Sequence, residues 1–125
     1  FVSMPIGLLK QMIIYKASDA GIKTIMQEES YTSQADITAM DYIPVYGVDA
    51  ENAVFSGRRI SRSLYRCFNG MIINADCNGA ANIMRKAITD AWNSITDFSF
   101  LASPEVSGFH ELNPLSISVK GIAAA

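Results

Sequence analysis

The chain is organised around the run Asn74-Ala75-Asp76-Cys77-Asn78-Gly79-Ala80-Ala81-Asn82-Ile83. One acidic side chain lies there among small polar residues, directly before a segment with helical periodicity. The apolar residues of that segment recur at i, i+3, i+4 and i+7 spacing: Ala80, Ile83, Met84, Ala87, Ile88, Ala91 and Trp92. The pattern predicts a helix from Asn78 to about Trp92.

Asp76 would therefore stand at the N-terminus of a helix. Free backbone N–H groups and the positive end of the helix dipole both favour a negative charge at that position. The simplest interpretation is that Asp76 or Asn78 caps the helix. The alternative, which depends on the other residues of the run, is that Asp76 belongs to a functional site.

Two more elements are predicted upstream. Ser3 and Pro5 are typical of a helix start, an apolar stripe from Leu8 to Ala17 follows, and Gly21 is a favourable C-terminal stop. The β-branched run Ile22 to Gln27 predicts a short strand. A helix, a tight turn and a strand together favour an α/β fold.

The middle of the chain combines an irregular segment with a hairpin. Residues 30–57 show no sustained period, so we expect a long connection or a small insertion there rather than core. Leu64 to Phe68 and Met71 to Ile73 flank Asn69-Gly70, which predicts a β-hairpin with a two-residue turn. Near the C-terminus, Leu115 to Val119 alternates like a half-buried strand, before an alanine-rich end that we expect to fray.

Composition limits the class of protein. The chain has 125 residues, half of them hydrophobic, which is enough for one small domain with a core. No apolar run approaches the roughly 18 residues of a membrane span, so we expect a soluble intracellular protein. Cys67 and Cys77 are too few for a disulfide framework or a four-cysteine zinc site, and we expect reduced thiols. A first residue of Phe1 rather than Met suggests that an upstream part is missing.

Charge is separated along the chain. Residues 28–51 contain six acidic residues and no Lys or Arg, whereas residues 54–86 contain six basic residues and one acidic residue, Asp76. The two blocks either neutralise one another across the fold or leave a basic surface for phosphates. The candidate nucleic-acid contacts are Arg58, Arg59, Arg62, Arg66, Arg85 and Lys86.

Several runs occur in a recognisable order: Tyr31-Thr32-Ser33-Gln34, then Arg66-Cys67-Phe68-Asn69-Gly70, then residues 74–86. This order resembles the C-terminal part of the OrfB/TnpB insertion-sequence transposases and, more remotely, the type V CRISPR effector nucleases. The similarity covers about residues 9 to 88. It implies a partial RNase-H-like (RuvC-like) α/β fold with a degenerate zinc-ribbon-like β-hairpin insertion.

The resemblance also divides the chain. Residues 1–29 would be a helix and strand of the RuvC-like domain, and residues 30–73 the zinc-ribbon-like insertion. Residues 74–92 would carry the third acidic motif with its helix, and residues 93–125 would be a C-terminal extension.

The implied function is that of an RNA-guided DNA endonuclease encoded by a mobile element. DNA, guide RNA and the missing N-terminal part of the same protein would be its partners, in a prokaryotic cytoplasm at the nucleoid. Asp76 would be the third catalytic carboxylate and a Mg²⁺ ligand, because two Mg²⁺ ions about 3.5–4 Å apart need charged oxygen ligands. The first two acidic motifs are absent, so we expect the isolated chain not to cleave DNA. Glu28 and Glu29 match a different segment of the family and are not expected to bind metal.

The sequence departs from the family at its zinc positions. Family members commonly carry two Cys-x-x-Cys pairs, and the corresponding positions here hold Asp36 and Ala39, then Arg66 and Asn69. We therefore expect the ribbon shape without bound zinc.

Two alternatives to an active nuclease segment stay open. One is a catalytically inactive, nucleic-acid-binding remnant of such a transposase, and the other is an unrelated α/β domain in which Asp76 caps a helix. The solitary His110 is expected to be structural. Trp92, Phe98 and Phe100 are expected to form core or interface rather than to stack on bases.

Overall fold

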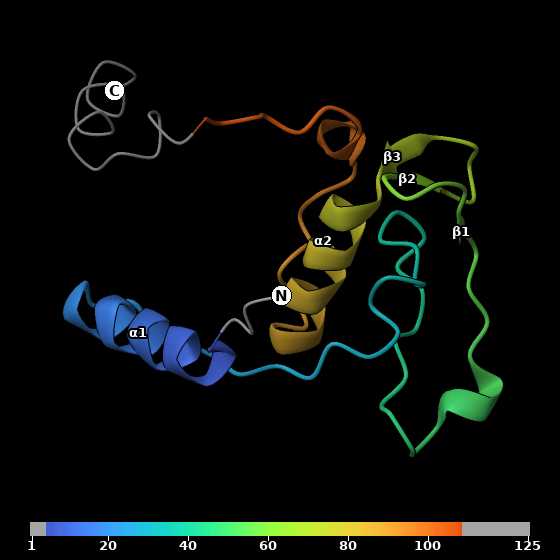
Figure 1. The fold of residues 1–125 in the computed structure, drawn as a ribbon. Coiled ribbons are helices and arrows are strands. Elements are labelled where there is room, and N and C mark those ends of the chain that lie inside the picture. Colours follow the sequence, from blue (N-terminus) through green and yellow to red (C-terminus); the bar gives the residue numbers. More distant parts are fainter. Residues whose placement is uncertain (1–4, 109–125) are drawn as a thin grey trace.

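The structure is a computed structural model that describes residues 5–108. Two α-helices, α1 (Ile6–Asp19) and α2 (Ala75–Ala87), occur together with a small sheet (Figure 1). The strands are β1 (Arg58–Arg59), β2 (Leu64–Arg66) and β3 (Ile72–Asn74), and the short 3-10 helices are η1 (Ala50–Asn52) and η2 (Ser99–Ala102). The strands are antiparallel in the order β1-β2-β3. These elements form a mixed α/β fold, and the finer assignment to a partial RNase-H-like fold stays a prediction.

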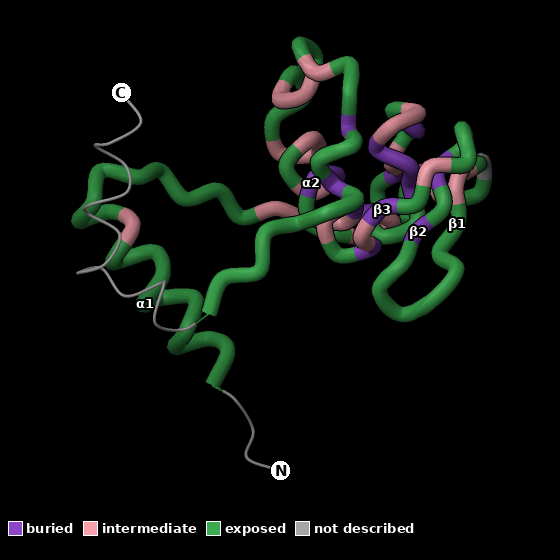
Figure 2. The backbone as a smooth tube through the Cα atoms, turned by 90° about the horizontal axis from the view of Figure 1, so that it is seen from above, coloured by how far each residue is buried: buried purple, intermediate pink, exposed green. Residues whose placement is uncertain are grey.

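The core lies between the sheet and α2. Tyr65 and Ile73 are opposite one another in β2 and β3, and both are fully buried. The other members of the core cluster are Ala75 and Ala81 of α2, Phe98 and Leu101 around η2, and Ile37 and Cys67. Figure 2 shows the buried residues gathered around α2 and the sheet, with α1 exposed along its length.

The predicted hairpin is present, but its turn differs from the prediction. Cys67 N–H donates to the carbonyl of Met71 at 2.8 Å, and Gly70 N–H donates to the carbonyl of Cys67 at 3.0 Å. Gly70 has φ +85°, whereas Asn69 is not among the positive-φ residues. The connection is therefore a three-residue loop with glycine in the left-handed position, not a two-residue Asn-Gly turn.

The segment 30–57, predicted to be a connection rather than core, is partly core. Thr32, Ala35, Asp36, Ile37 and Asp41 are all buried. The prediction was wrong here because hydropathy periodicity registers buried apolar side chains, whereas this segment is buried largely through polar groups that hydrogen-bond.

Two asparagines of α2 hold this segment in place. The Asn78 side chain accepts from Ile37 N–H at 3.1 Å and donates to the carbonyl of Ala35 at 2.8 Å. One turn later, Asn82 donates to the carbonyls of Ala35 and Thr32 at 2.7 and 3.0 Å. Because residues at i and i+4 share one helix face, both amides reach the same stretch of backbone.

The predicted first helix is confirmed, and it ends as expected at Gly21, which has φ +73°. Gly21 N–H donates to the carbonyl of Ser18 and Ile22 N–H to that of Ala17, a Schellman arrangement. The predicted strand Ile22 to Gln27 is wrong, because these residues have no regular secondary structure. A strand needs a partner for its backbone groups, and within residues 5–108 the sheet is made of β1, β2 and β3 alone.

The second helix begins and ends earlier than predicted. It ends at Ala87, and Ile88 adopts an extended conformation with φ −134° and ψ 98°. Trp92 lies on the returning chain, where its indole N–H donates to the carbonyl of Ala81 at 2.9 Å. Its ring centroid is 6.1 Å from that of Phe98 and 6.3 Å from that of Phe100. This agrees with a packing role for the three aromatic side chains, although Phe100 is half exposed.

The predicted strand Leu115 to Val119 and the predicted structural role of His110 lie outside the described residues. No helix within residues 5–108 is long and apolar enough to cross a bilayer.

Gly57 is a position where the packing permits no side chain. A Cβ added there would lie 2.5 Å from the ring of Tyr65 and 2.7 Å from the carbonyl oxygen of Arg66. We expect Gly57→Ala to destabilise the fold by about 1–3 kcal/mol, measured by urea unfolding. Gly79→Ala in α2 is the control, because its Cβ would meet nothing closer than 4.0 Å. It should be neutral or stabilising by up to about 1 kcal/mol, and equal effects of the two variants would contradict this packing.

Asn78→Ala should destabilise the chain by roughly 1–3 kcal/mol, because it leaves the buried N–H of Ile37 without an acceptor. Thermal and urea unfolding followed by circular dichroism measure the change. Asn93→Ala is a matched control, since Asn93 is exposed and its side chain has no hydrogen-bond partner among residues 5–108. Similar values for both variants would mean that Asn78 does not hold the segment.

Candidate functional site

Asp76 lies in the first turn of α2, in a helix that another residue caps. The side-chain oxygen of Asn74 accepts from the backbone N–H groups of Asp76 and Cys77, at 2.9 and 3.0 Å. The interpretation that Asp76 or Asn78 caps the helix is therefore wrong. Asn78 is buried against Ile37 and Ala35, and the side chain of Asp76 is 85% exposed. The carboxylate is thus available to something other than its own helix.

The carboxylate borders a groove of about 550 Å³. One wall is the segment from Glu29 to Ser33, which Asn82 of α2 holds through the carbonyl of Thr32, and the other is the first two turns of α2. Tyr31 in this wall has φ +64°, an uncommon conformation for a residue other than glycine. Its carbonyl accepts from the N–H groups of Gln34 and Ala35, which closes the turn.

Glu29 lines the same groove, so the structure brings a second acidic residue to the region of Asp76. Sequence patterns gave no sign of this, because the two residues are 47 positions apart and only the fold joins them. Among residues 5–108 no group of three or more His, Cys, Asp or Glu side chains is placed to hold a metal ion. Asp76 and Glu29 carry carboxylates, the type of side chain that Mg²⁺ prefers as a ligand.

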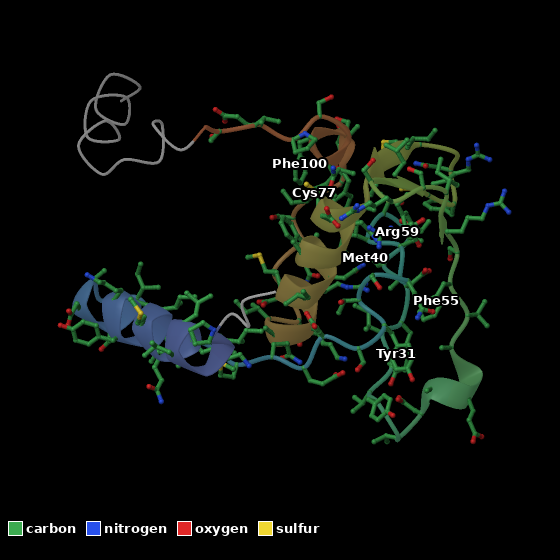
Figure 3. All side chains as sticks on the ribbon, in the orientation of Figure 1. Tyr31, Met40, Phe55, Arg59, Cys77 and Phe100 are labelled. Carbon is green, nitrogen blue, oxygen red and sulfur yellow. The ribbon has the colours of Figure 1, made fainter. Side chains whose placement is uncertain are left out.

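Arg59 is the basic residue that the structure places beside Asp76. Figure 3 labels the Arg59 side chain. Its guanidinium lies 3.4 Å from the carboxylate, and it also donates to the carbonyls of Ser61 and Arg62. Arg59 therefore holds the β1–β2 turn and reaches the N-terminal end of α2. Because the two side chains are 44% and 85% exposed, the ion pair contributes little to stability.

Three other predicted contact residues are exposed and have no acidic partner among residues 5–108: Arg58, Arg62 and Arg66. Arg58 and Arg66 are directly opposite one another in β1 and β2. Like charges at directly opposed positions repel, so this edge of the sheet is favourable for an anion. Arg62 lies in the turn between the same two strands.

Lys86 is largely buried, because its side chain is only 9% exposed. Its ammonium group pairs with Glu28 and donates to the carbonyls of Ser30 and Pro44 at 3.1 and 3.2 Å. The hydrogen bond from Lys86, followed by that from Ser30, lowers the pKa of Glu28 to about 2. Lys86 thus joins α2 to the beginning and to the middle of the acidic block.

Arg85 is similarly engaged. It donates to the carbonyl of Asp41 and contacts the sulfur of Met40, and burial lowers its pKa. The acidic and basic blocks therefore neutralise one another in part, through Lys86 and Glu28, and leave Arg58, Arg62 and Arg66 exposed.

Comparison with known proteins places this arrangement in a family. The chain is similar to the CRISPR-associated endodeoxyribonuclease Cas12f1 of Sulfoacidibacillus thermotolerans, with 38% identity over 76 residues, which are 60% of this chain and 15% of that protein. It is also similar to Cas12f2 of a Micrarchaeota archaeon, with 34% identity over 88 residues, 66% of this chain and 14% of that protein. No solved structure matches the chain. The family model described as "Cas12f1-like, TNB domain" matches residues 7–83, more than half of the chain, and the chain therefore belongs to the Cas12f1-like TNB-domain family.

Proposed function

We propose that this chain is a C-terminal segment of an RNA-guided, metal-dependent DNA endonuclease of the TnpB and Cas12 type, and that Asp76 is its third catalytic carboxylate. The observation that supports this most is the position of Asp76. Asn74 caps the helix, so the Asp76 carboxylate borders an open groove instead of binding backbone. Two relatives of the chain are named endodeoxyribonucleases.

Mg²⁺ would supply the hydrolytic chemistry, by activating water and stabilising the leaving oxygen. Asp76 would bind the ion, and the remaining carboxylates would come from other parts of the protein, because residues 5–108 lack a complete set. The matched region is only 15% and 14% of the relatives' lengths, which leaves room for those parts. Arg59 would orient the carboxylate and balance its charge.

The N-terminal elements fit a partial RuvC-like, RNase-H-like fold that the rest of the protein completes. The apolar stripe of α1 is exposed around a shallow groove of about 500 Å³, which Leu9, Met12, Ile13 and Ile22 help to line. In this proposal residues 1–29 belong to the nuclease domain, residues 30–73 are the ribbon-like insertion, and residues 74–92 carry the acidic motif. Residues 93–125 would be a C-terminal extension of the nuclease domain.

The exposed arginines would contact nucleic acid. Arg58, Arg62 and Arg66 have guanidinium groups without partners among the described residues, and phosphates are the ligands that arginine binds with a planar fork. Target DNA and guide RNA are the partners proposed, at the nucleoid of a prokaryotic cytoplasm. Arg85 and Lys86 are less suited to this role, since their donors already hold carbonyls and Glu28.

A second function is favoured by the incomplete acidic set. A chain with one acidic motif and an exposed arginine surface could persist as an inactive, nucleic-acid-binding remnant of a transposase. The two functions differ in whether Asp76 supports cleavage when the missing parts are supplied.

The purified 125-residue chain should not cut single- or double-stranded DNA in Mg²⁺, because one carboxylate motif cannot hold two ions. Robust cutting that Asp76→Ala abolishes would contradict this. The companion experiment replaces the matching segment of the Sulfoacidibacillus relative with residues 7–83 of this chain. We expect guided cutting by the chimera, reduced at least about 100-fold by Asp76→Asn and unchanged by Asp19→Asn, an exposed acid outside the groove. Equal rates for both variants would favour the remnant.

Nucleic-acid binding should depend on the exposed arginines. Replacing Arg58 and Arg62 by Ala should weaken binding of a DNA oligonucleotide and reduce the slope of log Kd against log salt by about 1–2, since about one counterion is released per phosphate contact. Lys10→Ala in α1 removes one exposed cation elsewhere and is the control. A salt slope unchanged by the double substitution would show that these arginines do not contact phosphates.

A further inference from the structure

The family resemblance implies a zinc ion held by two Cys-x-x-Cys turns, which we call knuckles. The residues at the four corresponding positions show whether zinc fits this chain. Ala39 offers no ligand atom, and Arg66 carries a cation. The side-chain oxygen of Asn69 already accepts from Met71 N–H at 3.0 Å. Of the four residues, Asp36 alone has a side chain that commonly binds zinc, and both of its carboxylate oxygens already accept hydrogen bonds. These residues do not fit a tetrahedral zinc site.

The Asp36 carboxylate instead joins the two knuckles directly. It is fully buried, and one oxygen accepts from the N–H and the hydroxyl of Thr38, at 2.9 and 2.6 Å. The other oxygen accepts from the N–H of Phe68, 32 residues away at the tip of the hairpin, at 2.7 Å. The bond to Phe68 runs between the two turns that a zinc ion would connect.

Asp41 makes a second connection from the same turn. Its carboxylate accepts from Asp36 N–H at 2.9 Å and from the N–H and hydroxyl of Ser56, at 2.8 and 2.5 Å. Ser56 immediately precedes Gly57 and β1, so Asp41 fixes the entry to the sheet. Together Asp36 and Asp41 accept hydrogen bonds from four residues, and we refer to these two side chains as the carboxylate clamp.

Cys67 lies beside Asp36 and belongs to no metal-binding group within residues 5–108. It is 3% exposed, and burial, with the carboxylate of Asp36 among the further causes, raises the pKa of its thiol to about 11. Cys77 lies on α2 and belongs to no metal-binding group within residues 5–108.

We propose that the carboxylate clamp replaces zinc in this chain, so that the unit formed by residues 30–73 and α2 folds and stays folded without metal. Two carboxylates saturated by hydrogen bonds can hold three backbone segments together as a metal ion would, because bonds to a charged acceptor are short and strong. The proposal concerns folding and does not depend on whether the chain takes part in cleavage.

Metal removal tests the proposal on the unaltered chain. The protein is purified from cells grown with added zinc, and half is dialysed against EDTA and 1,10-phenanthroline. Elemental analysis should give well below one zinc per chain in both samples, and their Tm values should agree within about 1 °C. Stoichiometric zinc together with a lower Tm after chelation would overturn the proposal.

A matched pair of variants tests the clamp itself. The control residue, Asp97, accepts from the N–H and hydroxyl of Ser99, at 2.8 and 3.0 Å. Asp36 likewise accepts from the N–H and hydroxyl of the residue two positions later, Thr38. Within residues 5–108, Asp97 makes no long-range bond like that between Asp36 and Phe68. Asp36→Asn replaces one carboxylate oxygen by an NH₂ group, which is a donor and cannot accept the buried N–H that the oxygen accepted. We therefore expect the Tm of the variant to fall by roughly 5–15 °C, or the variant not to fold. Asp97→Asn should lower Tm by less than about 3 °C. Equal small shifts would show that Asp36 does not act as a clamp.

Discussion

The fold depends on two side-chain amides that α2 inserts into the backbone of another segment. Asn78 and Asn82 are both fully buried, and between them they bind the carbonyls of Thr32 and Ala35 and the N–H of Ile37. Hydrogen bonds are directional, so these contacts fix the register of the segment along the helix as well as its proximity. The groove beside Asp76 has its shape because one of its walls is fastened in this way.

From that segment the connections continue into the sheet. Tyr65 of β2 donates its hydroxyl proton to the carbonyl of Gln34 at 2.6 Å, and burial raises the pKa of this phenol. Asp36 and Asp41 extend the same network to Phe68 and Ser56. A small domain buries limited apolar area, and additional constraints usually supplement its core. In this protein buried polar contacts provide these constraints.

Local signals in the sequence were sufficient for some elements. Gly21 marks the end of α1, and the alternation around Asn69-Gly70 reveals a hairpin, because each effect operates over a few residues. The helix start was misplaced because the run before α2 offers several capping side chains, and the sequence does not indicate that Asn74 takes this role. The buried character of residues 32–41 and the engaged ammonium of Lys86 arise from partners 15 to 58 positions away. The run from Ile22 to Gln27 has strand propensity but no partner strand within the described residues.

Because Asn74 caps α2, the residue that starts the helix is not Asp76, the residue proposed to act in catalysis. Because the helix begins correctly without the Asp76 side chain, a gene copy in which that codon has changed would still encode a folded protein. Protein quality control, which removes unfolded chains, would not recognise such a copy. Mutational decay at this position would therefore leave a persistent protein, and natural selection could retain such a product for whatever its remaining surface binds.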